Sequence, residues 1–199
     1  MASNRRIGTE GSKSRAALLD ATEQIMLEEG YAAVSSRRIA QKAGLKPQLV
    51  HYYFRTMDDL FLAAFRRLAE DGLERQAHAL ASGQPLRALW AFGNDPTGTA
   101  LAMEFAALAN HHKSIRSEIA RYAELFRSRQ TEVLDSVMRE HGIDTDLFPP
   151  VAVMVLITSV SQILVMEEAL GMSAGHAETR ELVARYLTHY DGTPQSTER

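Results

Sequence analysis

The segment Gly171-Met172-Ser173-Ala174-Gly175 matches the G-x-S-x-G pattern, in which a serine at a sharp turn acts as the nucleophile of acyl transfer. That chemistry requires a strand before the serine, a helix after it, and an acid and a histidine further along the chain. Only His176, His189 and a few acids follow here, and no α/β sheet is indicated. We therefore interpret the segment as a helix-ending loop and expect no enzymatic activity.

A second pattern that suggests chemistry is His111-His112 near Glu104, with His78 and His141 elsewhere in the chain. Zinc sites hold their ligands at tight spacing and often include cysteine, and the chain has no cysteine. Surface histidines are the favoured interpretation, so we expect no metal and no other cofactor. The lack of cysteine also excludes a disulfide framework and favours a cytoplasmic location.

Charge is distributed unevenly along the chain. Residues 1–57 contain nine Lys and Arg against five Asp and Glu, a balance of +4, whereas residues 58–199 contain 13 against 20, a balance of −7. A basic N-terminal part on an acidic remainder indicates that only the N-terminal part meets a polyanion. Residues 1–13 are predicted to form a flexible basic arm. Its cations either follow a DNA groove or belong to an ordinary disordered terminus, and they are Arg5, Arg6, Lys13 and the nearby Arg15.

Apolar residues recur at helical spacing through most of the chain, which predicts an all-α fold of about nine helices. Ser35 is a predicted N-cap, and Thr56 with Asp59 resembles a capping box before the apolar Leu60. After the arm, a first domain is expected at 14–56, a second at 57–192, and a loose tail at 193–199. The helices are expected at 14–29, from Ser35 to Ala43, from Pro47, and at 57–81, 85–92, 99–111, 114–141, 151–170 and 177–190.

Three short helices in the first 54 residues, the last two joined by a tight turn at Gly44, predict a helix-turn-helix. Its two helices must pack closely where they cross, and the apolar residues suited to this are Ile39, Ala40, Ala43 and Val50. The second helix must present polar and cationic side chains to the major groove, where base edges carry a distinguishable pattern of donors and acceptors. The motif predicts a DNA-binding domain.

The segment that carries these features resembles the DNA-binding signature of the tetracycline-repressor (TetR) family. It reads Ile39-Ala40-Gln41-Lys42-Ala43-Gly44-Leu45-Lys46-Pro47-Gln48-Leu49-Val50-His51-Tyr52-Tyr53-Phe54, followed by Asp59-Leu60. The likeness covers residues 14–65. The chain departs from the family pattern at Lys46, where a capping serine is usual, at Val50 and His51, and at Met57, where a lysine is usual.

The resemblance implies which side chains meet DNA. Pro47 opens the reading helix, and Gln48 is expected to contact a base because its amide pairs bidentately with adenine. Phosphates or neighbouring bases are expected partners of three further residues of this segment, Lys46, His51 and Tyr52. Backbone contacts, which position the protein without specifying sequence, are expected from Ser36, Arg37 and Arg55. The alternative for each residue is a solvated helix face.

The resemblance also implies that the larger domain binds a small-molecule effector and forms a homodimer. The expected interface helices are 151–170 and 177–190, so that two DNA-binding domains meet a palindromic operator. The apolar run 151–166 is shorter than the ~20 residues that a membrane span needs, so a core or interface helix is favoured. Candidate effector-binding residues are Trp90, Phe92, Met103, Phe105, Tyr122, Phe126, Gln130 and Met154, with Asn110 and Arg121 as further polar anchors.

The resemblance therefore predicts a transcriptional repressor that leaves its operator when an effector binds. An architectural DNA-binding protein without a ligand is one alternative, although it would not need so many further helical residues. A small helical enzyme is another alternative, although it would lack a catalytic constellation.

Overall fold

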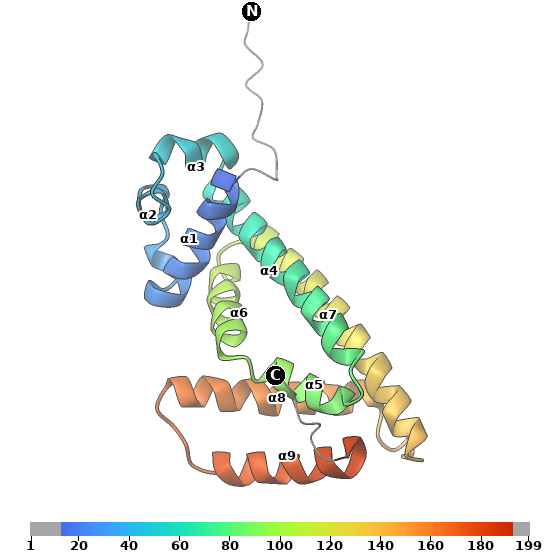
Figure 1. The fold of residues 1–199 in the computed structure, drawn as a ribbon. Helices are drawn as coiled ribbons and strands as arrows, with labels where there is room; N and C mark the ends of the chain where they lie inside the picture. Colours follow the sequence, from blue (N-terminus) through green and yellow to red (C-terminus); the bar gives the residue numbers. More distant parts are fainter. Residues whose placement is uncertain (1–12, 193–199) are drawn as a thin grey trace, which may run out of the picture. The chain divides into compact units, whose positions relative to one another are not determined.

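The protein was analysed as a computed structural model that describes residues 13–192. Over this range the chain forms nine α-helices and one short 3-10 helix, and it contains no strand (Figure 1). The predicted all-α fold is confirmed. By packing, the described residues up to 70 and residues 100–121 form one compact unit, here called unit 1, and residues 71–99 with the described residues from 122 on form a second, here called unit 2. The packing boundary therefore differs from the predicted division after residue 56.

Unit 1 begins with α1 (Lys13–Glu29), a 3-10 helix (Tyr31–Ala33), α2 (Ser36–Lys42) and α3 (Pro47–Tyr53). Ser35 caps α2 by accepting a hydrogen bond from the backbone N–H of Arg38, 3.4 Å away. Gly44 makes the turn to α3 with a φ of 65°, a conformation that glycine adopts without steric cost. The helix-turn-helix thus has the predicted cap and turn.

The rest of unit 1 comes from the first part of α4 (Met57–Leu80), most of α6 (Pro96–Ala109) and the start of α7 (Lys113–Glu140). The predicted capping box opens α4, since Asp59 N–H donates to Thr56 Oγ1 at 3.0 Å and Thr56 N–H donates to Asp59 Oδ2 at 3.1 Å. Phe65 of α4 meets Phe105 of α6 edge to face, with ring centroids 5.3 Å apart. Unit 1 therefore shares one core between the helix-turn-helix and these three longer helices.

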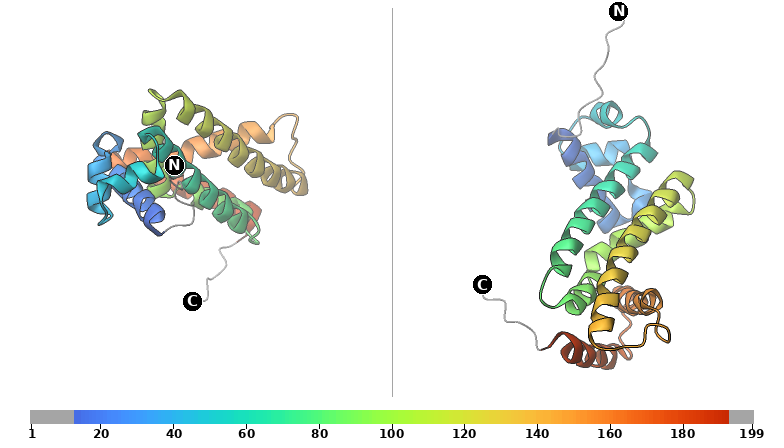
Figure 2. Two further views of the ribbon diagram at one scale, coloured as in Figure 1. Left: turned by 90° about the horizontal axis from the view of Figure 1, so that it is seen from above. Right: turned by 90° about the vertical axis from the view of Figure 1, so that its right-hand side faces the viewer.

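Unit 2 contains the second parts of α4 and α7, together with α5 (Pro85–Gly93), α8 (Pro150–Ala169) and α9 (His176–Asp191). Within it, α4 and α7 run side by side, with Gly72 against Phe126 (Figure 2). Helix α5 packs on both α8 and α9. At Gly93 a Cβ would lie 2.4 Å from Ser161 Oγ, so only glycine allows α5 and α8 to approach this closely.

Several helix bounds differ from the expected ones. Helix α6 starts at Pro96 rather than at residue 99, because Asp95 accepts the backbone N–H of Thr97 at 3.1 Å and of Thr99 at 3.0 Å. Helix α1 starts at Lys13, so Lys13 and Arg15 are helical rather than part of an arm, while Arg5 and Arg6 lie outside the described residues. Helix α8 has 20 residues, so the shortness of the apolar run is not an argument against a span. By length and composition α8 is apolar enough to cross a membrane.

Candidate functional site

Helix α3 has one buried face and one exposed face. Val50 is 1% exposed and packs into the core of unit 1 with Ile39 and Ala40 of α2. The predicted DNA-contacting residues of α3 and its flanks are all exposed, and they are Lys46, Pro47, Gln48, His51, Tyr52 and Arg55. Burying Val50 therefore fixes the rotation of α3 that turns the polar side chains outward.

The start of α3 explains how the chain tolerates Lys46 where a capping serine is usual. Lys46 occupies the N-cap position in an extended conformation, its side chain makes no capping hydrogen bond, and Pro47 fills the first turn. Proline suits this place because its fixed φ is helical and it has no N–H to satisfy. The exposed Lys46 side chain is thus left for contacts outside the helix.

The cations of α2 divide into two groups. Arg38 and Lys42 form ion pairs with Glu29 and Glu28 of α1. Arg37 is exposed, and Ser36 is half-buried at the start of the helix. Arg38 and Lys42 are thus held against α1 by ion pairs, whereas no such pair with α1 is described for Arg37, the predicted DNA contact of α2.

Aromatic residues stiffen the end of α3. Tyr52 and Tyr53 meet edge to face with centroids 5.1 Å apart, and the guanidinium carbon of Arg15 lies 5.4 Å from the centre of the buried Phe54 ring. A cation over a ring face is attracted by the ring quadrupole. Arg15 is therefore engaged with the core of unit 1.

Charged residues brace the helix-turn-helix within unit 1. Arg67 of α4 contacts Asp20 and Glu23 of α1, each at 2.7 Å. Glu104 of α6 accepts the backbone N–H of Tyr31 at 2.6 Å, in the connection between α1 and α2. These contacts hold α1 and its following turn against the longer helices.

Glu118 of α7 is the most strongly perturbed carboxylate of this bracing. It accepts hydrogen bonds from Arg121 at 3.0 Å and from Arg66 of α4. The two guanidinium groups lower the pKa of the Glu118 carboxyl to about 2. Glu118 thus ties α4 to α7 as a permanent anion near neutral pH.

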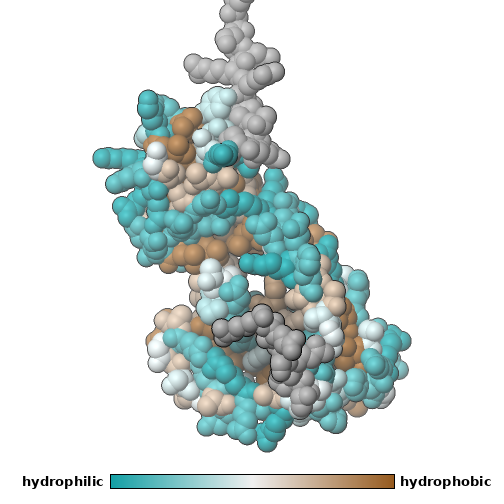
Figure 3. All heavy atoms as spheres, viewed as in Figure 1, coloured by the Kyte–Doolittle hydropathy of each residue, from teal (hydrophilic) through white to brown (hydrophobic). Residues whose placement is uncertain are grey.

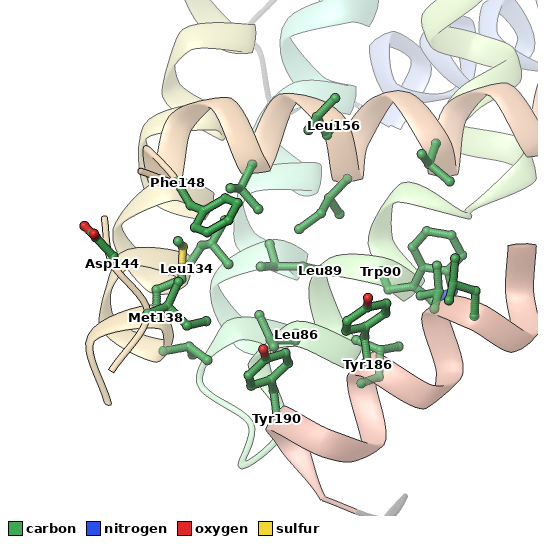
Figure 4. Close-up of a pocket in the computed structure, with 18 residues that line it drawn as sticks. Leu86, Leu89, Trp90, Leu134, Met138, Asp144, Phe148, Leu156, Tyr186 and Tyr190 are labelled. Atoms are coloured by element: carbon green, nitrogen blue, oxygen red, sulfur yellow. The ribbon is translucent and has the colours of Figure 1, made fainter. Parts of the chain in front are cut away.

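Unit 2 contains a cavity of about 950 Å³ between α5, α7, α8 and α9 (Figure 4). Of the residues predicted to bind an effector, only Trp90 lines it. Met154 lies in the adjacent buried cluster with Leu89, Leu134 and Met138. The other predicted residues of unit 2 do not line this cavity: Phe92 and Phe126 pack on each other, with centroids 5.8 Å apart, and Tyr122 and Gln130 are buried.

The remaining predicted effector residues, Met103 and Phe105, belong to unit 1 together with Asn110 and Arg121. Phe105 is fully buried against Phe65, and Met103 is 46% exposed. The cavity instead has mostly aliphatic walls. The sequence prediction, which rests mainly on aromatic and methionine residues, does not include them. The signal that could have found it is the apolar stripe of α9, at helical spacing, formed by Leu182, Val183, Tyr186, Leu187 and Tyr190.

The packed turn and the outward polar face of α3 define unit 1 as a helix-turn-helix, the motif of a large class of DNA-binding proteins. The family model of the bacterial regulatory proteins of the tetR family matches residues 18–64, which span this motif. Over these residues the chain is similar to the tetR family.

Two curated relatives carry regulator names. The chain is 29% identical over 123 residues to the HTH-type transcriptional regulator BetI of Rhizobium meliloti, which covers 57% of this chain and 61% of BetI. It is 35% identical over 63 residues to the HTH-type transcriptional regulator PksA of Bacillus subtilis, which covers 32% of this chain and 31% of PksA. The chain thus matches less than two thirds of the length of each relative. Neither is named as an enzyme, in agreement with the expectation from the sequence.

Solved structures share the whole fold. A putative transcriptional regulator from Saccharomonospora viridis in complex with choline has a TM-score of 0.76 at 17% identity, covering 88% of this chain and 96% of that one. A TetR transcription regulator from Haloarcula marismortui has a TM-score of 0.71 at 20% identity, covering 92% of this chain and 98% of that one. At these identities the likeness concerns the fold, which extends beyond the helix-turn-helix to the later helices.

Proposed function

We propose that this protein is a DNA-binding transcriptional regulator that reads a specific operator with α3. The observation that carries the proposal is the division of α3 into a buried Val50 and an exposed polar face with Lys46, Gln48 and His51. A recognition helix in the major groove needs this arrangement, because its core face fixes the orientation in which the other face meets base edges.

Within this proposal the exposed residues have distinct roles. Gln48, in the first turn of α3, is assigned the base contact, since a glutamine amide pairs bidentately with the N6 and N7 atoms of adenine. Lys46, His51 and Tyr52 contact phosphates or neighbouring bases. Ser36, Arg37 and Arg55 contact the DNA backbone, which sets the register and contributes most of the dependence of affinity on salt.

We assign α8 and α9 to a homodimer interface. Only 22% of the most apolar window of α8 is buried, although its mean hydropathy is 1.8. Its exposed apolar side chains include Val151, Val155 and Ile163, the C-cap Leu170 is also exposed, and α9 exposes Leu182 and Tyr186. Apolar patches also break the hydrophilic surface on the face drawn in Figure 3. Exposed patches of this kind mark interaction surfaces, and a second copy would bring two copies of α3 to half-sites of a palindrome ~34–36 Å apart.

The proposed regulation is release of DNA when a small molecule binds in unit 2. The cavity between α5, α7, α8 and α9 has a volume within the range of ligand sites, roughly 300–1,000 Å³. The choline complex of the S. viridis regulator supports ligand binding in this fold. A ligand that prefers the non-DNA-binding arrangement lowers operator affinity by its differential binding energy, typically ~1–3 kcal/mol. The proposed outcome is repression relieved by the ligand.

The test begins by selecting the preferred duplex from a randomised DNA pool with the full chain. Fluorescence anisotropy then measures affinity for that duplex and for single-base variants. Gln48→Ala is expected to cost about 1–3 kcal/mol on the preferred site and to relax the preference at one base pair. Lys46→Ala is expected to weaken all duplexes alike and to reduce the salt dependence.

Gln24→Ala is the matched control, because Gln24 is an exposed glutamine of α1 outside the proposed interface. It should leave both affinity and preference unchanged. If Gln48→Ala also leaves both unchanged, α3 is not the reading helix. Sedimentation of the free protein tests the dimer, and a monomer at the concentrations that bind a palindrome would contradict it.

A further inference from the structure

The cavity of unit 2 has almost entirely apolar walls. Its floor comes from α5 and α7, including Leu89, Trp90 and Leu134, and its sides come from α8 and α9 (Figure 4). Most of the other lining residues are Leu, Val and Ile. Such walls favour a ligand that gains its affinity by removing apolar surface from water.

Asp144 is the one charged residue of the lining, and its carboxylate is engaged outside the cavity. The carboxylate of Asp144 accepts the backbone N–H of Asp146 at 2.9 Å and of Leu147 at 3.3 Å, so it closes the turn after α7. In Figure 4 its oxygens point away from the other lining residues. A charged ligand group inside the cavity would therefore lose its hydration without gaining a counter-ion, which is costly.

Polar atoms are still available at one wall. Tyr186 and Tyr190 rise from α9 towards α8, and each carries a hydroxyl that both donates and accepts hydrogen bonds (Figure 4). Such groups suit a neutral hydroxyl or carbonyl. Their rings, with that of Trp90, offer a cation only the attraction of ring faces.

Polar contacts attach α9 to unit 2 at both of its ends, and at the N-terminal end His176 Nε2 lies 2.8 Å from Glu167 Oε2 of α8. The one buried residue of α9 is His176, and its apolar stripe faces the cavity rather than a packed core. At the C-terminal end, Arg87 of α5 donates its backbone N–H to Asp191 Oδ2 at 2.7 Å and its guanidinium to Thr188 Oγ1 at 2.9 Å. A molecule that fills the cavity would supply the apolar packing that α9 lacks.

We propose that this cavity binds an uncharged, largely apolar small molecule and that binding packs α9 onto α5, α7 and α8. The molecule lies against Trp90 and the α9 stripe, and any polar end is a neutral hydroxyl or carbonyl near Tyr186 or Tyr190. This inference rests on the proposed function, because the molecule would be the effector of that regulator. It goes further by fixing the chemical class of the effector and the helix that responds to it.

Trp90 provides the assay, because it is the only tryptophan of the chain and it lines the cavity. Three probes with a ten-carbon chain and a terminal bromine that quenches tryptophan are compared for binding to the full protein in the absence of DNA. They are 10-bromodecan-1-ol, 10-bromodecanoate and (10-bromodecyl)trimethylammonium. The neutral alcohol is expected to quench Trp90 with a Kd at least ~10-fold below those of the two ions, and to raise Tm most. Equal or tighter binding of either ion overturns the assignment to an uncharged ligand.

A charge placed in the cavity sharpens the test. Leu187→Glu adds a carboxylate to the α9 wall and is expected to weaken the alcohol while favouring the trimethylammonium probe. Leu125→Glu is the matched control, because Leu125 is an exposed leucine of α7 outside the lining. It should leave all three affinities unchanged. Comparison of the probes on the unmodified chain stands alone if Leu187→Glu fails to fold.

The remaining outcomes separate this proposal from the one before it. If Leu187→Glu turns a dimer into a monomer and no probe quenches Trp90 in the unmodified chain, a second copy fills the cavity and the proposal is wrong. Gln48→Ala should bind the alcohol as the unmodified chain does. Failure of the alcohol to bind while the operator is still recognised would overturn the ligand and leave DNA reading intact.

Discussion

Units 1 and 2 handle apolar surface in opposite ways. In unit 1 the two seven-residue helices α2 and α3 bury Ile39 and Val50 almost completely and expose mainly polar or aromatic side chains. In unit 2, α8 and α9 present more apolar surface than the unit covers, and Leu156 is 66% exposed at the edge of the cavity. A polar DNA-reading surface needs a fully packed core behind it to hold its side chains in place. A surface that binds an apolar partner instead leaves apolar side chains exposed until the partner covers them.

The largest loss of stability is expected when a charge is placed in the packed core of unit 1. Val50→Asp buries a carboxylate without a partner and should destabilise unit 1 by more than ~4 kcal/mol, with loss of operator binding. Leu156→Asp puts the same charge on an exposed position of α8. It should change the urea unfolding free energy of the monomer by less than ~0.5 kcal/mol while weakening self-association. Similar unfolding costs for the two variants would remove the contrast between the units.

A methionine pair tests how far unit 2 is packed. Met154 is 1% exposed in the cluster with Leu89, Leu134 and Met138, so Met154→Ala should cost ~2–5 kcal/mol in urea unfolding. Met103 is 46% exposed, and Met103→Ala should stay within ~0.5 kcal/mol. A cost below ~1 kcal/mol for Met154→Ala would mean that the core beside the cavity is as loose as the cavity itself.

A smaller effect is expected at the cap of α2. Ser35→Ala removes the oxygen that accepts the N–H of Arg38 and should cost ~0.5–1 kcal/mol, because the bond is long at 3.4 Å. Ser35→Gly should cost only a few tenths of a kcal/mol. Thermal unfolding followed by circular dichroism measures both. No loss of stability in Ser35→Ala relative to the unmodified chain would show that the hydroxyl makes no contribution.

The last effect is expected from Glu118 and depends on pH. Its folded pKa of about 2 lies below the ordinary 4.5, so the carboxylate stabilises the fold above pH 4.5. That contribution is lost as the pH falls from 4.5 through 2. Glu118→Gln should therefore be less stable than the unmodified chain at pH 6, and the difference should shrink towards pH 2 in urea unfolding. A difference independent of pH would mean that shape rather than charge matters there.

The two units also differ in how well the sequence predicts them. Ser35, Gly44, Pro47 and the Thr56–Asp59 box act on neighbours within a few residues, so their spacing alone locates the helix ends that the structure shows. The DNA contacts themselves stay predictions, although the exposure of Gln48 and its neighbours fits them. The helical period indicates that Val50 faces the core. The exposure of Gln48 and its neighbours follows, because they lie on the opposite face of the helix.

The cavity is a tertiary feature, and the sequence does not indicate which helices surround it. Trp90, predicted to bind an effector because it is large and apolar, lines the cavity, but Phe105 has the same character and lies in the core of unit 1. Residue type separates apolar from polar faces and does not separate core from cavity. The start of α6 was missed for a related reason, since Asp95 and Pro96 read equally well as a loop and as a helix start.

The contact between Glu104 and Tyr31 bears on protein engineering. The backbone N–H of Tyr31 is satisfied by a carboxylate 73 positions further along the chain, and Arg67 reaches back to Asp20 and Glu23. A fragment cut after the helix-turn-helix would lose these partners and expose core residues of α1. The helix-turn-helix is consequently not an independently folding domain. A chimera that exchanges it should carry residues 13–70 together with 100–121.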